Sequence, residues 1–373
     1  MNLRKSHLAA AVGVAFMAGG AAVHAQTPGV TSGQPLQIQL YGHINRALMY
    51  ADNETANKWF FVDNQVSSSR FGIMGSADIG GGLRAGSRLE TEIRSNRSNE
   101  VNFVSPTNGS AQGFTERWID VFVEGSWGRV NLGQGSGAAD DASTIDLSGT
   151  SVVSGTTITD LGGAIPFTTS AGAPIATLLS VADNLDFESR YDRVMYTTPV
   201  FGGFRVQVGT GQKDNTGEAN EASLWYSGKL AGDLQAAIGW SEVKNAGICA
   251  TCDNRLTMGG SVSWLHTSGL NLTAQYTTRE LDSVPGGRDA TSMAFKVGYK
   301  FGPHAIAALW QHGEDQAADG DKADGFNIAY VWNPIRWAEF YTSYTLWQLD
   351  HSRPGVGDAN DITVFTLGSR IRF

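Results

Sequence analysis

Proline, cysteine and long apolar runs are scarce in this chain of 373 residues. It holds 10 Pro and 2 Cys beside 46 Gly, a composition that is neither disordered nor collagen-like. Beyond residue 25 no run of 18 or more apolar residues occurs, so we expect no membrane-spanning helix. The remaining 348 residues could form one large β-domain or two ordinary ones.

Positive charge is also in short supply, with 27 Lys and Arg against 36 Asp and Glu. Without Arg4 and Lys5, which belong to a predicted leader, the net charge is 25 − 36 = −11. No basic stripe occurs, which argues against a nucleic-acid partner. G-x-S-x-G is missing, and the five histidines beyond the leader show no metal-ligand spacing. We therefore predict no enzyme, no metal and no cofactor.

The first 25 residues have the pattern of a secretory signal peptide. Arg4 and Lys5 precede an apolar run over 8–22, and Val23-His24-Ala25 resembles a small-residue cleavage site. The sequence predicts cleavage after Ala25, which leaves 26–373 as a single domain.

Most of the chain alternates between polar and apolar residues with period two, as β-strands do. At the C-terminus Thr363, Phe365, Leu367, Ser369, Ile371 and Phe373 share one face, and Val364, Thr366, Gly368, Arg370 and Arg372 share the other. A half-buried sheet and a barrel standing in lipid around a wet interior both predict this alternation.

The connections distinguish these two folds. We predict strands at 36–50, 66–79, 83–95, 114–126, 129–136, 188–200, 203–213, 219–230, 233–243, 254–267, 269–281, 290–301, 304–314, 324–333, 336–349 and 361–373. Seven short, mostly Gly- or Pro-containing turns alternate strictly with eight longer connections, centred near 58, 105, 162, 216, 249, 286, 319 and 355. Aromatic residues gather near the strand ends. The predicted fold is all-β, a transmembrane antiparallel β-barrel of 16 strands.

The third long connection, residues 137–187, is the least regular part of the chain. It carries six Gly and six Asp, no Lys or Arg, and is followed by Glu188. A loop of this length inside a compact domain is usually functional. We expect it to fold into the barrel and narrow the lumen.

Opposed charges at such a constriction would filter solutes. Alternation indicates that the basic residues facing the lumen from the wall are Arg70, Arg84, Arg88, Arg94, Arg193 and Arg205. Glu90 and Glu92 share the face of Arg88. The acids expected to face them from the loop are Asp140, Asp141, Asp146 and Asp160. The alternatives are internal salt bridges for the arginines and solvated surface positions for the aspartates. The loop's acids favour a mild preference for cations.

Cys249 and Cys252 form a lone C-x-x-C in a predicted external loop. A zinc site would need further ligands. In an oxidising compartment a tight loop disulfide is the better interpretation.

Five segments resemble those of one known family. They are LQIQLYGHINRALMY (36–50), SSSRFGIMGSADIGGGLRAGSRLETE (67–92), RWIDVFVEGSWGRVNLGQG (117–135), SRYDRVMYTTPVFGGFRVQVG (189–209) and TLGSRIRF (366–373). The family that they resemble is the Gram-negative general porins. The resemblance implies a trimeric 16-stranded barrel of the cell outer membrane, in contact with lipid and lipopolysaccharide, whose third external loop forms an eyelet. The terminal Phe373 looks like the family's signal for outer-membrane assembly.

The predicted function is passive diffusion of small hydrophilic solutes and ions through a water-filled channel. A substrate-specific channel is the first alternative. An outer-membrane barrel hydrolase, with His266 near Ser263 or Ser268, is a second, and an adhesive surface protein is a third.

Overall fold

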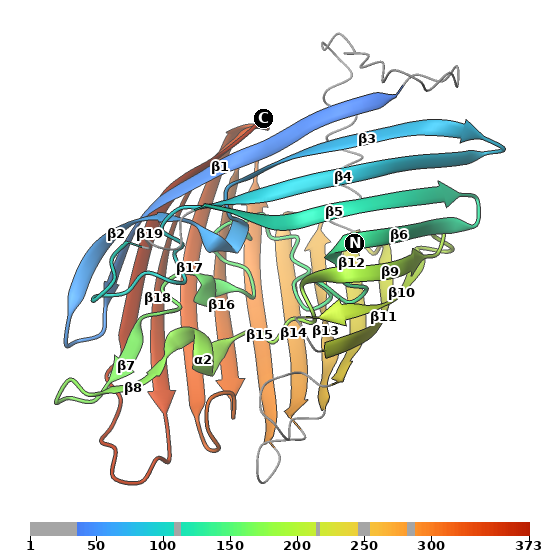
Figure 1. Cartoon of the computed structure of the whole chain (residues 1–373). Helices are drawn as coiled ribbons and strands as arrows, with labels where there is room; N and C mark the ends of the chain where they lie inside the picture. The colour runs from blue at the N-terminus through green and yellow to red at the C-terminus, as the bar shows by residue number, and fades with distance from the viewer. Residues whose placement is uncertain (1–35, 108–112, 214–216, 245–253, 282–287) are drawn as a thin grey trace.

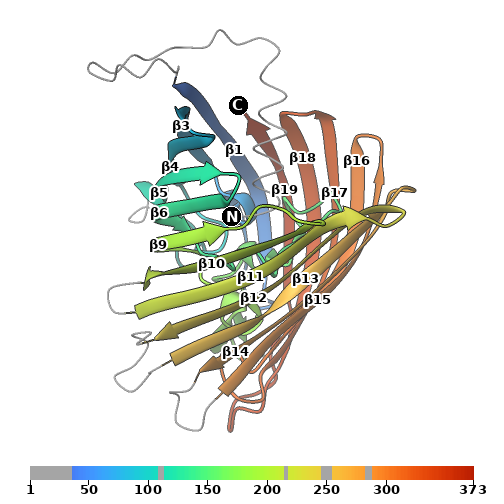
Figure 2. The same ribbon diagram turned by 90° about the vertical axis from the view of Figure 1, so that its right-hand side faces the viewer.

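One closed antiparallel sheet forms the wall of the molecule (Figures 1 and 2). The computed structural model describes residues 36–107, 113–213, 217–244, 254–281 and 288–373. The strands of the sheet are β1 (Gln37–Asp52), β2 (Asn57–Asp63), β3 (Arg70–Gly80), β4 (Leu83–Arg94), β5 (Gly113–Gly125), β6 (Gly128–Ser136), β9 (Arg190–Thr197), β10 (Phe204–Lys213), β11 (Gly217–Lys229), β12 (Gly232–Lys244), β13 (Asn254–His266), β14 (Leu270–Leu281), β15 (Arg288–Phe301), β16 (His304–Glu314), β17 (Lys322–Ile335), β18 (Ala338–Asp350) and β19 (Ile362–Arg372).

Smaller elements lie between the wall strands. They are the 3-10 helices η1 (Gln65–Ser67) and η3 (Ile158–Asp160), the paired strands β7 (Pro166–Thr168) and β8 (Pro174–Thr177), and the helix α2 (Leu178–Ala182). In the described part of the chain, no helix has the length and hydropathy needed to cross a membrane. The predicted leader and the pair Cys249–Cys252 lie outside the described residues.

The sheet closes where β19 pairs with β1, with His43–Asp52 against Arg372–Thr363. The other edge of β1 pairs with β2 through residues 46–52 and with β3 through residues 37–43. β2 and β3 are therefore two halves of one interrupted strand. The 17 described strands of the sheet make a barrel of 17 − 1 = 16 strands, which confirms the predicted fold.

Three details of the predicted strand pattern are wrong. Residues 57–63, placed in a long connection, form β2, and the strand expected from 66 begins at Arg70 after η1. β10 and β11 are separated by three residues, so the connection near 216 is short. β2 escaped notice because Trp59-Phe60-Phe61-Val62 is apolar on both faces, which hides the period of two.

The two faces of the wall differ along every long strand. On β12 and β17, Ile238 and Ile328 point outward and are 62% and 68% exposed, while their neighbours Ala237 and Ala329 point inward and are buried. An apolar outer band and an inner face of small and polar residues are what a barrel in lipid requires.

Residues 137–189 turn inward after β6. Their contacts fall on inward-facing side chains, such as Ser223 of β11 and Ser261 of β13. Figure 1 shows the part with β7, β8 and α2 beside β15 to β18. We call residues 137–187 the constriction loop.

Candidate functional site: the constriction

The outgoing limb of the constriction loop follows the wall from β11 to β15. Ser223 Oγ donates to the carbonyl of Ala138 at 2.5 Å. Ser261 and Ser263 of β13 accept from the backbone N–H groups of Ile145 and Leu147, both at 2.9 Å. Short hydroxyl side chains thus satisfy loop backbone groups that a strand ladder would otherwise have paired.

The return limb runs back along the wall from β16 to β12. Gln311 Nε2 of β16 donates to the Ala182 carbonyl at 2.8 Å, and Gln275 Nε2 of β14 to that of Asn184 at 3.2 Å. At β12 the two limbs meet over Gly239, where an added Cβ would lie 2.8 Å from Phe187 and 3.0 Å from Ala139. We call the inward faces of β11 to β19 the covered wall.

Between the limbs, the loop is seated on an apolar cluster. Its loop members are Val152, Val153, Ile158, Leu161, Ile165, Phe167, Leu178, Val181 and Ala182. Its wall members come from β1, β2 and β15 to β19, and include Met49, Phe60, Leu309, Tyr341, Trp347 and Val364. Every member is at most 7% exposed. Full burial of one large apolar side chain is worth about 1.5–3 kcal/mol, so this seat fixes the loop firmly.

The interruption between β2 and β3 also holds the loop. Asn64 caps η1 by accepting from Val66 N at 3.0 Å. Its Nδ2 donates to the Val152 carbonyl at 2.9 Å and to Tyr341 Oη at 3.0 Å. The strand break therefore lets one side chain of the wall reach the loop.

Away from the loop, β3, β4 and β5 present charged side chains to the lumen. Glu90 of β4 accepts from Arg88 Nη2 at 2.5 Å, Tyr41 Oη at 2.8 Å and Arg117 Nε at 2.7 Å. Arg70 Nη1 lies 3.9 Å from Glu90, and Arg70 Nε donates to the Ser68 carbonyl. We call the inward faces of β3 to β5 the open wall. The order of strands places β4 half a turn of the barrel away from β14.

A second glutamate completes this cluster. Glu92 lies 2.5 Å from Arg97 Nη2 and 3.3 Å from Arg117 Nη1. Four arginines (70, 88, 97 and 117) thus share two glutamates, which leaves 4 − 2 = +2. The side chains of Arg70, Arg88 and Arg117 are 17%, 9% and 7% exposed, because they pack against Glu90 and neighbouring side chains of the wall such as Tyr41 and Trp118.

The other predicted wall arginines have local partners. Arg193 is buried, with Nη2 3.0 Å from Asp120 Oδ2 and Nε donating to the Ser136 carbonyl at the base of the loop. Arg205 is buried over the ring of Trp225. Arg94 pairs with Glu100 at 3.0 Å. Arg84 is 44% exposed at the end of β4, 3.7 Å from Glu124.

Two predicted loop acids lie in buried or bonded positions. Asp146 Oδ2 is 2.7 Å from Lys296 Nζ of β15, and both side chains are 1% exposed. Asp160 Oδ1 accepts from Asn99 Nδ2 at 3.1 Å. Burial, together with the nearby charge of Asp183, raises the pKa of Asp160 to about 7.

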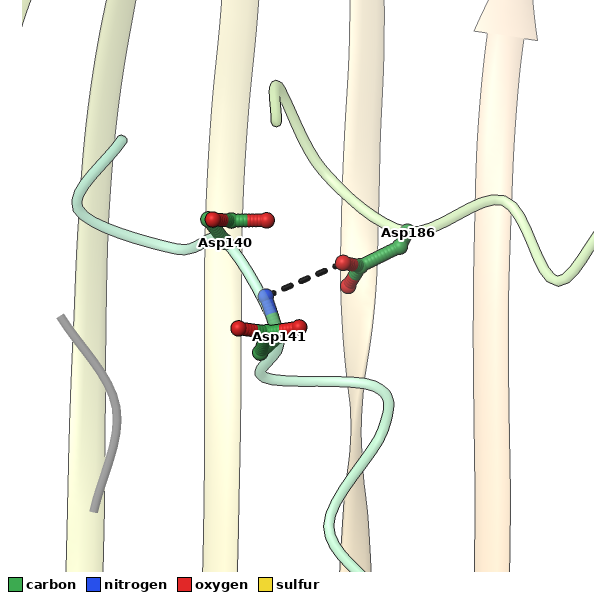
Figure 3. A group of neighbouring side chains, drawn as sticks. All are labelled: Asp140, Asp141 and Asp186. Atoms are coloured by element: carbon green, nitrogen blue, oxygen red, sulfur yellow. Dashed lines mark hydrogen bonds between the residues drawn. The ribbon is translucent and has the colours of Figure 1, made fainter. Parts of the chain in front are cut away.

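The remaining two, Asp140 and Asp141, meet Asp186 where the two limbs converge (Figure 3). Asp186 Oδ2 accepts from Asp141 N at 3.0 Å. Carboxylate oxygens of the three residues lie within 4.8 Å of one another, a spacing at which they could share a cation. Burial and the charges of the other two carboxylates raise the pKa of Asp186.

Several residues of the site were missed from the sequence, among them Arg97, which pairs with Glu92, and Arg117, Lys296 and Asn64. Arg117 sits at a register shift between β4 and β5, and this bulge turns both Arg117 and Trp118 away from the outer face. Lys296 lies on the inward face that alternation indicates, but a buried partner for it in the loop could not be foreseen. Asn64 acts through a strand break that the pattern did not reveal.

The residues of the hydrolase alternative form local contacts. His266 Nδ1 lies 2.8 Å from Ser268 Oγ within one short turn and accepts from Ser268 N at 3.2 Å. Ser263 is buried between the loop and Thr273.

Comparisons with known proteins agree with this architecture. A family model described as Gram-negative porin matches residues 9–346. Outer membrane porin protein 32 of Delftia acidovorans is 27% identical over 307 residues, 79% of each chain. Among solved structures, an anion-selective porin from Comamonas acidovorans has a TM-score of 0.66 at 20% identity, covering 91% of this chain and 100% of that chain. OmpT of Vibrio cholerae in a trimer form has a TM-score of 0.58 at 15% identity, covering 91% and 99%.

A family match over most of the chain, a porin relative and a closed 16-stranded barrel lead to one conclusion. The chain belongs to the Gram-negative porin family and is a diffusion channel of the outer membrane.

Proposed function

We propose that solutes cross the barrel between the open wall and the constriction loop, and that the open wall selects them by charge. The observation that carries this proposal is the cluster of four arginines on two glutamates. The constriction loop seated inside the barrel supports a narrow passage, which admits small hydrophilic solutes and excludes large ones.

The preferred ions are anions. The loop acids, which favour cations when counted from the sequence, contribute less negative charge than their number implies. Asp146 is neutralised by Lys296, and the pKa values of Asp160 and Asp186 are raised. The net positive charge of the open wall therefore dominates the local potential. The structurally similar porin from Comamonas acidovorans is described as anion-selective, which supports this direction.

Reconstitution into planar bilayers tests the proposal. Under a KCl gradient we expect the zero-current potential of the wild-type channel to have the sign that a preference for chloride produces. A potential of the opposite sign would refute the proposed filter while leaving the channel itself intact.

We further propose a homotrimer embedded in lipid and lipopolysaccharide, exported by a signal peptide that is cleaved after residue 25. The trimer form of the Vibrio cholerae relative supports the oligomer, and conductance steps in groups of three equal levels would test it. We propose no catalytic role, because His266 caps its own turn and Ser263 is occupied by loop and wall contacts.

A further inference from the structure

We propose that Lys296 is the positioning residue of the constriction, the side chain that keeps the loop's far turn, residues 146–154, in one place while the channel is open. This inference rests on the proposed passage between the loop and the open wall. It names the side chain that keeps the width of that passage constant.

Lys296 ties together both ends of the far turn. Its Nζ lies 2.7 Å from Asp146 Oδ2 and also donates to the carbonyl of Ser154. The other carboxylate oxygen of Asp146 accepts from Ser148 N at 2.8 Å. One ammonium group therefore closes the turn upon itself and fastens it to β15.

The wall is shaped to receive this turn. Gly298 is the next residue after Lys296 on the inward face, and a Cβ there would lie 3.0 Å from Ser148 Cβ. A larger residue would press on the turn and lift it from the ion pair.

A second tie holds the same turn from the other side. Asn64, in the break between β2 and β3, donates to the carbonyl of Val152 at 2.9 Å. The far turn thus spans from β15 to the interrupted strand, with contacts at 146, 152 and 154. Two loop members of the apolar seat, Val152 and Val153, lie at the end of the far turn, and the others lie beyond it, from Ile158 onwards. The seat therefore holds the end of the turn, whereas Lys296 also holds its beginning at Asp146.

Burial makes this tie sensitive to loss of either partner. Both side chains are 1% exposed, and an ion pair in such a place leaves an uncompensated charge when one member is removed. Lys300, further along the inward face of β15, is exposed. Its side chain passes Gly149, since a Cβ there would lie 3.3 Å from Lys300 Cε. The two lysines face the same lumen, but Lys296 alone carries the buried pair with Asp146.

Single-channel recording of the full chain in planar bilayers provides the test. Lys296→Met frees the turn, and we expect a severalfold higher frequency of brief closures and a wider spread of open conductance at a fixed voltage. Lys300→Met is the matched control, because it removes the same charge from the same inward face without cutting the tie. It should close as rarely as the wild type.

The double variant Asp146→Lys/Lys296→Asp restores the ion pair with its charges exchanged and should return the closure frequency towards that of the wild type. If Lys296 acted only by packing, this double variant would not restore the frequency. If Lys296→Met fails to form a folded barrel, Asp146→Asn, which preserves volume, is recorded by the same criterion. Closure frequencies equal to those of Lys300→Met would overturn the proposal. Failure of the charge filter is read separately, from the zero-current potential.

Discussion

The open wall and the covered wall share one strand geometry but carry different inward side chains. β4 and β5 point Arg88, Glu90 and Asp120 into the barrel, whereas the covered wall points mostly Ala, Gly, Ser and Thr. Small side chains leave room for a second layer of backbone, and their hydroxyl groups bond it. Long charged side chains fill the space themselves and pair with one another. The loop therefore covers the part of the wall whose inward side chains are mostly small.

The loop's apolar seat should show the largest effect of any single change. Phe167 is fully buried there, and Phe→Ala in a packed core costs about 3–5 kcal/mol. Phe167→Ala should speed hydrogen exchange over residues 150–182, measured by mass spectrometry, while the barrel strands stay protected. Phe61→Ala is the control, because Phe61 is 72% exposed on the outer face. Equal exchange in the two variants would mean that the seat does not hold the loop.

A smaller effect is expected where both limbs cross β12. In Gly239→Ala the new methyl group would overlap Phe187 and Ala139, and overpacking of this kind costs about 1–3 kcal/mol. The limbs should shift, and the single-channel conductance should change. Gly75→Ala is the control, because a Cβ added at Gly75 would lie 3.8 Å from its nearest neighbour, Leu36 Cδ1, and would cause no overlap. Unchanged conductance in Gly239→Ala would indicate that the limbs do not border the passage.

The smallest effect concerns pH. The pKa of Asp160 is about 7 in the folded chain against an ordinary value of 3.8, and its neighbours include Asn99, Asp183, Glu92 and Arg97. The folded state binds the proton of the Asp160 carboxyl more tightly than the unfolded state does. The contribution of Asp160 to the free energy of unfolding is therefore fully present below about pH 4 and is lost as pH rises through about 7.

Heat stability of the wild-type barrel should therefore fall by a few degrees between pH 5 and pH 8. Asp160→Asn should reduce this slope, to which the raised pKa of Asp186 also contributes, and Asp358→Asn, in an exposed outer connection, should keep it. A slope in Asp160→Asn equal to that of the wild type would assign the pH dependence to other groups.

Alternation of residues was enough to predict the barrel and its 16 strands, because lipid and lumen impose opposite demands on neighbouring side chains. The same rule places Arg70 and Arg88 on the inward face, where both contact Glu90. It failed at β2, where Phe60 faces the loop's apolar seat and Phe61 faces outward, so both faces are apolar.

Residues whose role depends on pairing between distant segments could not be predicted. Arg117 turns inward at a bulge, which appears only when β4 and β5 are in register. Asp146 was expected to face the arginines and instead binds Lys296, 150 residues away along the chain. Sequence periodicity gives the direction of a side chain, but not the partner that the loop brings to it.

In the proposed mechanism the open wall is the surface that selects ions by charge. The direct measurement is the zero-current potential of Arg70→Gln/Arg117→Gln in a KCl gradient, with Arg84→Gln, an exposed arginine at the end of β4, as control. Removing two of four arginines brings the local charge from +2 to 2 − 2 = 0. One unit charge about 4 Å from an ion in water contributes about 1 kcal/mol, roughly fivefold in preference. With two such charges removed, the preference for chloride should fall by at least about fivefold, while Arg84→Gln stays near the wild type. An unchanged potential in the double variant would contradict the account.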